Sequence, residues 1–423
     1  MKRILLVAAK TGYQVREFYG AAERLGVHLV LATDRCHILD DPWSDRAAPV
    51  QFAHPQGAME ALKQRGPFDG IVAVGDQPAY VAAEIAACLG LHFHSPQSVR
   101  AANDKFRTRE RFRAAGMLVP AYSLYSANEP KYPCVLKPLH LSASRGVIRA
   151  NNTREFEEAL ARVRKITRGE AVLVEDFIPG SEFALEGIVT AGCLQTLAIF
   201  DKPDPLDGPY FEETIYVTPS RETGAIQQAI HAAAQQAVNA LGLSHGPVHA
   251  EMRVNSRGVW MLEAAARPIG GLCARVLKFC GPGCQPAADC QSASSGLVGN
   301  APLSDRPYNE ISLEELLLLH AVGEHPAHIS LTPDAHGVMM IPIPESGIFQ
   351  RASGQESASR VPGITAVEIT AKEGQKLEAL PEGASYLGFL FARCSTPERA
   401  EQALRSAHAC LHFQMNQALP VVK

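Results

Sequence analysis

Two short segments, 248–254 (VHAEMRV) and 259–265 (VWMLEAA), constrain the fold more than any other part of the chain. Both are rich in β-branched or large apolar residues and carry a charge at alternate positions, which is typical of strands. The residues between them (256–258, Ser-Arg-Gly) predict a three-residue hairpin loop, with the glycine in the left-handed conformation of a bulge. This register places Glu251 opposite Glu263, and both leave the same face because the side-chain period of a strand is two.

Two like charges that face each other across a hairpin destabilise it. A sheet keeps such a pair when a cation lies between the carboxylates or when one carboxyl group shares a proton. Two carboxylates beside phosphate oxygens form the ligand set that Mg²⁺ prefers, and Arg267, four residues after Glu263, could bind the same phosphate. The alternative is a slightly different register, in which one glutamate pairs with a surface arginine. The hairpin alone therefore predicts either a metal–phosphate site or a surface ion pair.

The length of 423 residues predicts two to four domains, and 46% apolar residues are enough to give each a core. Charged residues make up 20%, which argues against disorder, and the net charge of −4 gives no indication of a nucleic-acid partner. No apolar run approaches the roughly 18 residues that span a bilayer, and the opening MKRILLVAAKTG is better explained as a first strand than as a signal peptide. We expect a cytoplasmic protein with no membrane or nucleic-acid partner.

The ten cysteines indicate a reducing compartment, because they are scattered and mostly lie in apolar segments. One group is denser and comprises Cys273, Cys280, Cys284 and Cys290. Its spacing fits no zinc-binding pattern, so we predict no metal there, and the role of the group stays open.

The first ninety residues alternate strands and helices, which predicts a parallel sheet with helices on both faces. The expected elements follow in the order strand 3–9, helix 14–25, strand 27–32, strand 70–74 and helix 78–90. Ligands of such sheets bind beyond the carboxyl ends of the strands, here near Ala9–Gly12 and Gly75–Gln77. Because the sequence contains no GxGxxG, a dinucleotide is a weak candidate.

The rest of the chain predicts two α+β parts. The first combines helices at 96–115, 154–167 and 225–241 with strands at 132–138, 147–150, 171–178, 182–190 and 193–200, and ends with the hairpin. After about residue 300 we expect a helix at 313–321, strands at 337–344, 364–369 and 386–394, and a helix from Thr396 to Phe413. This last part is predicted to be a small α+β domain with no chemistry of its own.

Lys137 ends a predicted strand and precedes a stretch of small residues, 139–146 (LHLSASRG). Small side chains let backbone N–H groups approach a phosphate, and the ammonium group adds a point charge. A surface lysine beside a turn is the alternative. Residues 175–178, at the end of another strand, could bind an adenine edge and Glu182 ribose hydroxyls, although exposed hairpin carboxylates are commoner. His249 shares the face of Glu251, which suits either a packed histidine or a substrate ligand.

Together these segments resemble the ATP-grasp superfamily of carboxylate–amine ligases. The matching segments keep the family's order and are 103–120, 132–147, 172–183, 246–253 and 262–271. The tail after Gly337 resembles the C-terminal domain of L-amino acid ligases, which make dipeptides. The resemblance implies a Rossmann-like domain (1–96), an ATP-grasp domain whose two α+β lobes clasp ATP (97–300) and a small α+β C-terminal domain (301–423), an α/β plus α+β fold.

The resemblance also implies the nucleotide site. Lys105 and Lys137 would contact the ATP phosphates, together with Ser144 in the small-residue loop. The adenine would be lined by Glu175, Asp176, Phe177 and Ile178, and Glu182 would bind the ribose.

The metal and substrate sites are implied in the same way. Glu251 and Glu263 would ligate Mg²⁺ or Mn²⁺, and Arg267 would be the catalytic residue that holds the γ-phosphate and the acyl phosphate. The substrate side would comprise the Gly270-Gly271 turn, which cradles the carboxylate, with His249, Lys202 and Glu213. Many members carry a metal-binding asparagine where this chain has Ala265, so one metal is expected to be held more weakly or to have water in its shell.

The resemblance therefore predicts an ATP-dependent carboxylate–amine ligase that joins two small molecules, expected to be amino acids, through an acyl phosphate, with release of ADP and phosphate. Two alternatives stay open. One is an ATP-grasp ligase or carboxylase that acts on another carboxylate, and the other is a nucleotide-binding protein without catalysis. The sequence leaves open the identity of the two substrates and the oligomeric state, a homodimer included.

Overall fold

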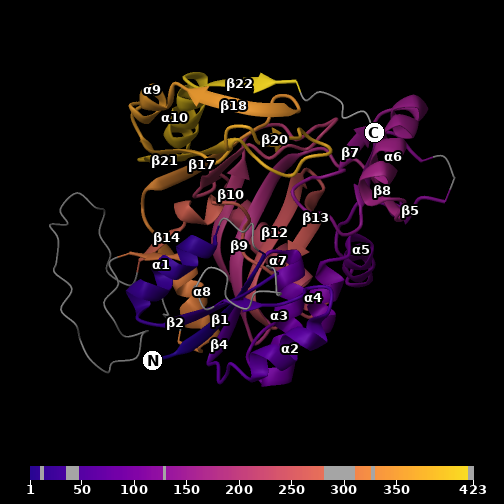
Figure 1. Cartoon of the computed structure of the whole chain (residues 1–423). Helices are drawn as coiled ribbons and strands as arrows, with labels where there is room; N and C mark the ends of the chain where they lie inside the picture. The colour runs from indigo at the N-terminus through magenta and orange to yellow at the C-terminus, as the bar shows by residue number, and fades with distance from the viewer. Residues whose placement is uncertain (10–13, 35–46, 127–129, 281–309, 325–328, 418–423) are drawn as a thin grey trace.

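The computed structural model describes residues 1–9, 14–34, 47–126, 130–280, 310–324 and 329–417. Figure 1 shows the large central sheet between the N-terminal helices on one side and the C-terminal elements on the other. Among the described residues, no helix combines the length and the apolar character needed to cross a bilayer.

The N-terminal part is the predicted parallel sheet. Its strands are ordered β3-β2-β1-β4, with bounds Ala48–Pro49, His28–Thr33, Arg3–Ala8 and Gly70–Val74, and every pairing is parallel. Alternate residues of β1 enter different cores: Leu5 and Val7 pack with α2 (Pro55–Lys63) and α3 (Asp76–Leu89). Ile4, Leu6 and Ala8 pack on the other face with α1 (Val15–Leu25) and α8 (Leu313–Ala321). Both faces are therefore covered, which explains the unbroken apolar strands.

The predicted helix over 96–115 is wrong, because two helices occupy this stretch. α4 spans Pro96–Ala102 and α5 spans Lys105–Ala114. Between them Asp104 has an extended backbone, and its carboxylate accepts a hydrogen bond from the N–H of Arg107 at 3.1 Å. Asp104 therefore caps a new helix, as short polar side chains do at helix starts.

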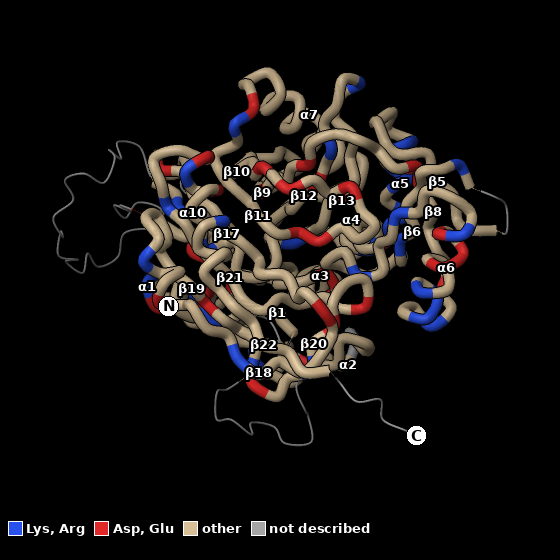
Figure 2. Tube along the Cα trace, turned by 90° about the horizontal axis from the view of Figure 1, so that it is seen from above, with Lys and Arg blue, Asp and Glu red and all other residues tan. Residues whose placement is uncertain are grey.

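A small antiparallel sheet forms the first lobe of the middle part. Its order is β5-β8-β6-β7, with bounds Tyr122–Leu124, Val172–Asp176, Cys134–Pro138 and Ile148–Ala150. Helix α6 (Thr153–Thr167) covers one face through Phe156, Leu160 and Val163. Figure 2 shows this lobe at one side of the molecule, beside the large sheet.

The large sheet has eight strands in the order β13-β12-β9-β10-β11-β17-β21-β19. Their bounds are Gly258–Ala265, His245–Asn255, Ser181–Thr190, Cys193–Lys202, Ile215–Thr218, Ala335–Ile341, Gly388–Cys394 and Ile364–Ile369. Helix α7 (Gly224–Leu241) packs against β9, β10 and β13. Because β11 pairs with β17, the C-terminal strands continue the sheet of the middle part, so the two parts share one backbone framework.

The remaining C-terminal elements form a second layer. Strands β20 (Lys376–Leu377), β18 (Gly347–Ser353) and β22 (His412–Asn416) pair in that order, beside α9 (Gln355–Ser359) and α10 (Pro397–Ala409). The predicted helix through Phe413 is wrong at its end. It stops at Ala409, and residues 412–416 pair with β18 instead.

Short elements connect the middle and last parts. They are η1 (Cys273–Val276) and the sheet of β14 (Lys278–Cys280), β15 (Ile311–Ser312) and β16 (Ser330–Leu331). Cys273 and Cys280 are buried there, whereas Cys284, Cys290 and the expected domain boundary at 301 lie outside the described residues.

The register of the β12–β13 hairpin places Glu251 opposite Glu263, as predicted. The loop differs from the prediction, since Asn255 pairs with Gly258 and only two residues connect the strands. The extra residue lies further along, where Met252 pairs with Met261 and the next pair is Glu251 with Glu263. One residue of β13 is thus moved from the loop to a bulge, and the register of the carboxylates is unchanged.

Candidate functional site

The predicted site residues gather around one cavity of about 450 Å³. All of them line its wall except Lys202, which lies directly behind it. The cavity lies where the carboxyl ends of β1 and β4 meet the small lobe and the large sheet, so Ala9, Gly75 and Asp76 also line it. This is the edge that the strand order predicted for a ligand.

A buried ion-pair group anchors Lys137. Its ammonium lies 2.7 Å from Glu175 Oε2, and Arg109 Nε lies 2.5 Å from Glu175 Oε1. Burial would raise the pKa of Glu175, but Arg109 and Lys137 outweigh it and lower the pKa to about 2. The carboxylate is therefore ionised and engaged. Glu175 lines the cavity chiefly as the residue that fixes Lys137, a role the sequence did not indicate.

A flat apolar wall follows directly after β8. Two guanidinium groups lie close to the ring of Phe177, with Arg149 4.0 Å and Arg253 5.0 Å from its centroid. Arg253 also donates hydrogen bonds to the carbonyl of Ile178 and to Glu182 Oε2, both at 2.8 Å. Arg253, which is buried, thus holds three of the predicted nucleotide-site residues in place. Such a wall suits a planar heterocycle.

The small-residue loop between β6 and β7, residues 142–146, contributes residues 142–144 to the next part of the wall and is called the phosphate loop below. Ala143 and Ser144 have φ of 53° and 54°, in the left-handed region that non-glycine residues rarely occupy. Lys105 lies beside the loop, because its ammonium donates to the carbonyl of Leu141 at 2.7 Å. It also lies 3.5 Å from Glu263 Oε2, so it connects the loop with the hairpin.

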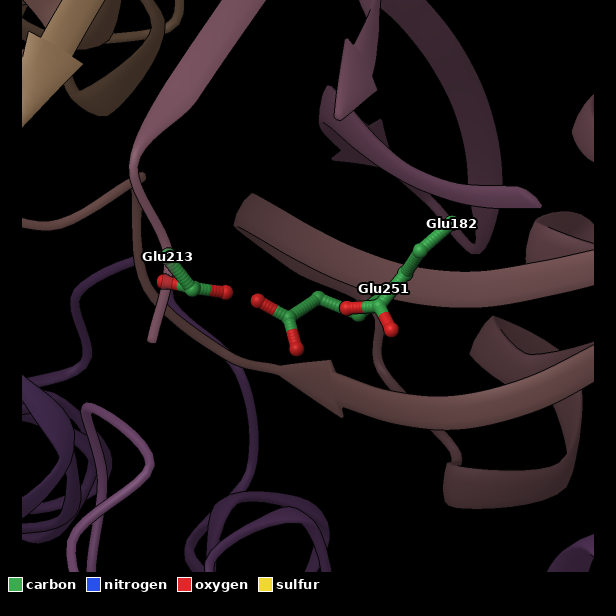
Figure 3. A group of neighbouring side chains, drawn as sticks. All are labelled: Glu182, Glu213 and Glu251. Carbon is green, nitrogen blue, oxygen red and sulfur yellow. The ribbon is translucent and has the colours of Figure 1, made fainter. Parts of the chain in front are cut away.

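Three carboxylates surround Lys202 at the base of the cavity. Its ammonium lies 2.6 Å from Glu213, 3.0 Å from Glu182 and 3.2 Å from Glu251. Figure 3 shows the Glu213 and Glu251 carboxylates pointing toward each other, with Glu182 beside Glu251. Lys202 is therefore part of the support of the carboxylates rather than of the exposed wall.

Burial and neighbouring charges shift the pKa values of two of these carboxylates in opposite directions. Burial raises the pKa of Glu213 to about 7, although Lys202 opposes the shift. Burial would also raise the pKa of Glu251, but Lys202 and His249 lower it well below its usual range. Glu251 is thus held as an anion facing the cavity.

The donor set fits a hard divalent cation. Glu251 and Glu263 lie opposite each other, offer only oxygen ligands and face a cavity lined by lysines, which is the environment of Mg²⁺ or Mn²⁺ beside phosphate. Ala265 pairs with His249, is buried and offers no donor. Oxygen atoms of Glu182, Glu213 and Glu251 also lie within 4.8 Å of one another, but the ammonium of Lys202 already pairs with all three carboxylates.

Arg267 is held by an acid from the N-terminal part. Its Nε donates to Asp76 Oδ1 at 2.8 Å, and its Nη1 donates to the carbonyl of Pro268 at 3.2 Å. Burial would raise the pKa of Asp76, but Arg267 lowers it below its usual value. Asp76 was not among the predicted site residues, although its place after β4 indicated the region.

His249 and the glycine turn share one buried anchor. Glu186, fully buried, pairs with His249 Nδ1 at 3.1 Å and accepts a hydrogen bond from the N–H of Ile269 at 3.1 Å. His249 Nε2 lies 3.5 Å from Glu251. Burial would lower the pKa of His249, but Glu186 and Glu251 raise it to about 9. Glu186 thus aligns the histidine with the start of the Gly270-Gly271 turn.

The C-terminal part, which was predicted to have no chemistry of its own, also contributes side chains to the wall. Met340 from β17 and Tyr386, just before β21, line the cavity near Cys273. Their apolar surface faces the same space as the glycine turn. No local sequence pattern indicated them, because they reach the site through the pairing of β11 with β17.

Three family models match the chain, in the order that the resemblance requires. They are the ATP-grasp N-terminal domain over residues 19–92, the ATP-grasp domain over 130–276 and the L-amino acid ligase C-terminal domain 2 over 339–416.

The chain is similar in sequence to two curated proteins whose names describe an ATP-grasp enzyme and a ligase. The ATP-grasp enzyme fsqD of Aspergillus fumigatus is 27% identical over 303 residues, which cover 60% of this chain and 53% of that protein. The alanine–anticapsin ligase of Bacillus subtilis is 28% identical over 224 residues, 45% of this chain and 47% of that protein. The chain thus spans about half the length of the curated relatives it matches.

Solved structures share the whole fold. The L-amino acid ligase from Bacillus licheniformis superposes with a TM-score of 0.77 at 24% identity and covers 99% of both chains. Carboxyaminoimidazole ribonucleotide synthase from Aspergillus clavatus, solved with ATP, has a TM-score of 0.69 at 18% identity and covers 97% of this chain and 98% of that one. The chain therefore combines an ATP-grasp N-terminal domain, an ATP-grasp domain and a C-terminal domain of the L-amino acid ligase type, on the fold that these solved structures share.

Proposed function

We propose that this protein joins the carboxylate of one amino acid to the amino group of another, using ATP and releasing ADP and phosphate. The observation that carries the proposal is the opposition of Glu251 and Glu263 on the wall of a cavity that also holds Lys105, Lys137 and Arg267. Two carboxylates and three cations in one enclosed space suit a polyphosphate with its divalent ion. The L-amino acid ligase type of C-terminal domain favours amino acids as substrates.

The reaction would proceed in two displacements. A carboxylate oxygen of the first substrate attacks the γ-phosphorus, and the bond from that phosphorus to the bridging oxygen breaks, which gives an acyl phosphate and ADP. The amino nitrogen of the second substrate then attacks the acyl carbon, phosphate leaves with the bonding electrons, and the nitrogen loses a proton. Both steps depend on positioning and charge neutralisation more than on covalent help from the protein.

Each group of residues has a role in that sequence. Phe177, Ile178 and Glu182 would orient the nucleoside, while Lys105 and Lys137 would neutralise its phosphates. Glu251 and Glu263 would hold the divalent ion, which supplies charge neutralisation on the phosphate oxygens when bound.

Arg267, with Asp76 fixing its direction, would face the transferred phosphoryl group. The Gly270-Gly271 turn would present backbone N–H groups to the first carboxylate. Tyr386 and Met340 would bound the space for the side chains of the substrates.

A product screen tests the proposal. The purified chain is incubated with MgATP and each pair of amino acids, and phosphate release is read together with the mass of the products. We expect at least one pair to give equal amounts of ADP and of a product whose mass is the sum of the two acids less one water. The Glu263→Gln variant, which keeps the shape of the side chain, should give neither.

Two outcomes would contradict the proposal. Turnover that requires bicarbonate or a ribonucleotide would indicate the carboxylase alternative. Nucleotide binding without ADP formation under any pair would indicate a binding protein, in which Ala265 marks the lost ligand.

A further inference from the structure

The phosphate loop is held from outside its own lobe, by residues 381–386 of the C-terminal part, which we name the clasp segment. The N–H of Gly146 donates to the carbonyl of Pro381 at 2.8 Å. Next to it, Arg145 Nε donates to the carbonyl of Glu382 at 2.9 Å. Two consecutive loop residues are therefore bound to two consecutive residues that lie more than two hundred positions further along the chain.

The side chain of Glu382 makes a second connection to the same lobe. Its two oxygens accept from Arg162 Nε at 2.9 Å and from Arg162 Nη2 at 2.8 Å. This is the two-point geometry in which an arginine fixes a carboxylate most firmly. Arg162 lies on α6, which covers the lobe, and it also bonds the hydroxyl of Tyr210. Glu382 thus contacts the lobe at its loop and at its helix.

The clasp segment reaches the substrate side of the cavity as well. Tyr386 at its end lines the central cavity, as does Ser144 of the phosphate loop. Ala143 and Tyr386 also share the wall of a second, very small cavity, so the loop and the segment lie against each other. The contact therefore extends from the surface pair Arg162–Glu382 inward to the wall of the site.

The conformation of the loop explains why such support is needed. Ala143 and Ser144 both have left-handed backbones, which persist only where surrounding contacts fix them. A Cβ at Gly146 would approach Pro138 Cγ to 2.7 Å, so the loop also lies tightly against the end of β6. The hydrogen bonds from Arg145 and Gly146 to the clasp segment therefore help to keep the loop from relaxing out of this conformation.

We propose that Glu382 is a positioning residue that keeps the phosphate loop closed over the nucleotide and, through Tyr386, ties that closure to the substrate side. The inference rests on the proposed function, since it takes the cavity to be the ATP site. Closure of a loop over a phosphoryl-transfer site excludes water. In this protein it would protect the acyl phosphate from hydrolysis until the amine arrives.

Glu382→Ala and Glu382→Gln are compared with the wild type and with Arg154→Ala. The control removes another arginine–glutamate pair of α6, with Glu158, that makes no contact with the clasp segment. We expect Glu382→Ala to raise the KM for ATP roughly 3- to 10-fold and to release more than one phosphate per product. Glu382→Gln retains one acceptor oxygen for Arg162 and should recover most of both values. Arg154→Ala should match the wild type.

Limited trypsin digestion measures how accessible the loop is, because the peptide bond after Arg145 lies within the loop. Glu382→Ala should be cut there several-fold faster than the wild type, and a nonhydrolysable ATP analogue with Mg²⁺ should protect the wild type more than the variant. Equal cutting and an unchanged KM for ATP in Glu382→Ala would overturn the inference. If Glu382→Ala does not fold, the exchanged pair Arg162→Glu with Glu382→Arg replaces it, and digestion slower than in Arg162→Glu alone is expected.

The digestion also separates this inference from the proposed function. It needs no amine substrate and no product. If no amino-acid pair reacts while the loop is released in Glu382→Ala, the proposed function fails and the positioning role stands. If product forms and the loop is unaffected, the reverse holds.

Discussion

Arg267 Nε lies 2.8 Å from Asp76 Oδ1, although 191 residues separate the two in the chain. The pair joins the start of α3 in the N-terminal part to the segment that follows the β12–β13 hairpin. Arg267 is mostly buried, so its guanidinium depends on Asp76 for both charge balance and direction. The N-terminal part therefore contributes to the wall of the cavity around Arg267 rather than only covering it.

Asp76→Asn should separate orientation from binding. The amide keeps the shape of the side chain but loses the charge that fixes Arg267, and a small misplacement of a group near the reacting atoms is costly. We expect kcat to fall roughly 10- to 100-fold while the affinity for ADP, measured by titration, changes less than about threefold. Asp69→Asn serves as control, because Asp69 pairs at the surface with Lys2 and the N–H of Arg3. A parallel loss of ADP affinity would contradict an orienting role.

Glu263→Gln and Glu251→Gln should both abolish ATP turnover, by roughly 100-fold or more, because each removes a proposed charged ligand of the divalent ion. Their effects on stability should differ. Glu251 also balances Lys202 at 3.2 Å, so its loss should lower the free energy of unfolding by about 1–3 kcal/mol. Glu263 lies no closer than 3.5 Å to Lys105, so Glu263→Gln should change the free energy of unfolding little. The measurements are the Mg²⁺ dependence of ADP formation and urea unfolding.

Glu158→Gln is the control for both variants, since Glu158 is exposed and pairs with Arg154 on α6. Full activity in Glu263→Gln at ordinary Mg²⁺ would contradict the metal assignment. An equal loss of stability in both variants would contradict the separate role of Glu251.

Much of the fold could be predicted because the signals were local. The β1 and β4 strands are continuous apolar runs that both faces of a covered sheet require. The hairpin register followed from the period of two, and even a wrong loop length left Glu251 opposite Glu263. The two predicted helices were too long because a helical period alone does not show where a capping residue or a strand partner ends the helix. Asp104 and residues 412–416 supplied those interruptions.

The supporting residues of the site could not be predicted, because their partners are distant in the chain. Arg109 is one of several arginines in α5, and only its contact with Glu175, 66 residues away, distinguishes it. Glu186 stands inside an apolar strand and gains its role from His249 and Ile269. A sequence pattern indicates groups that face a ligand, whereas the groups that orient them are defined by tertiary contacts.

The contact between His94 of the N-terminal part and the start of β12 is expected to weaken in acid. Its Nδ1 accepts from the N–H groups of Ser244 and His245 at 3.1 and 3.2 Å, so Nε2 carries the hydrogen and donates to the carbonyl of Pro247 at 3.0 Å. Burial lowers the pKa of His94 from 6.5 to about 4. The folded state therefore binds fewer protons than the unfolded state between these values.

The direction in which stability changes with pH follows from this difference in bound protons. The contribution of neutral His94 is complete above pH 6.5 and is lost as the pH falls toward 4, by up to about 3 kcal/mol. We expect His94→Gln to be less stable than the wild type at pH 8 but to lose less stability between pH 6.5 and 4, as measured by urea unfolding. His231→Gln, at an exposed histidine, should keep the wild-type slope. An unchanged slope in His94→Gln would contradict the assignment.

Gly270 and Gly271 should respond differently to alanine. Gly271 has φ +62°, and a Cβ there would lie 3.2 Å from Phe389 Cε1 in β21, which is fully buried and cannot give way easily. The left-handed backbone and the close contact together should lower the free energy of unfolding by about 2–4 kcal/mol in Gly271→Ala. A Cβ at Gly270 would meet no atom within 4 Å, so Gly270→Ala should unfold like the wild type and instead raise the KM for the carboxylate substrate, because the methyl group stands at the cavity wall. Equal thermal midpoints for the two variants would show that Phe389 does not constrain the turn.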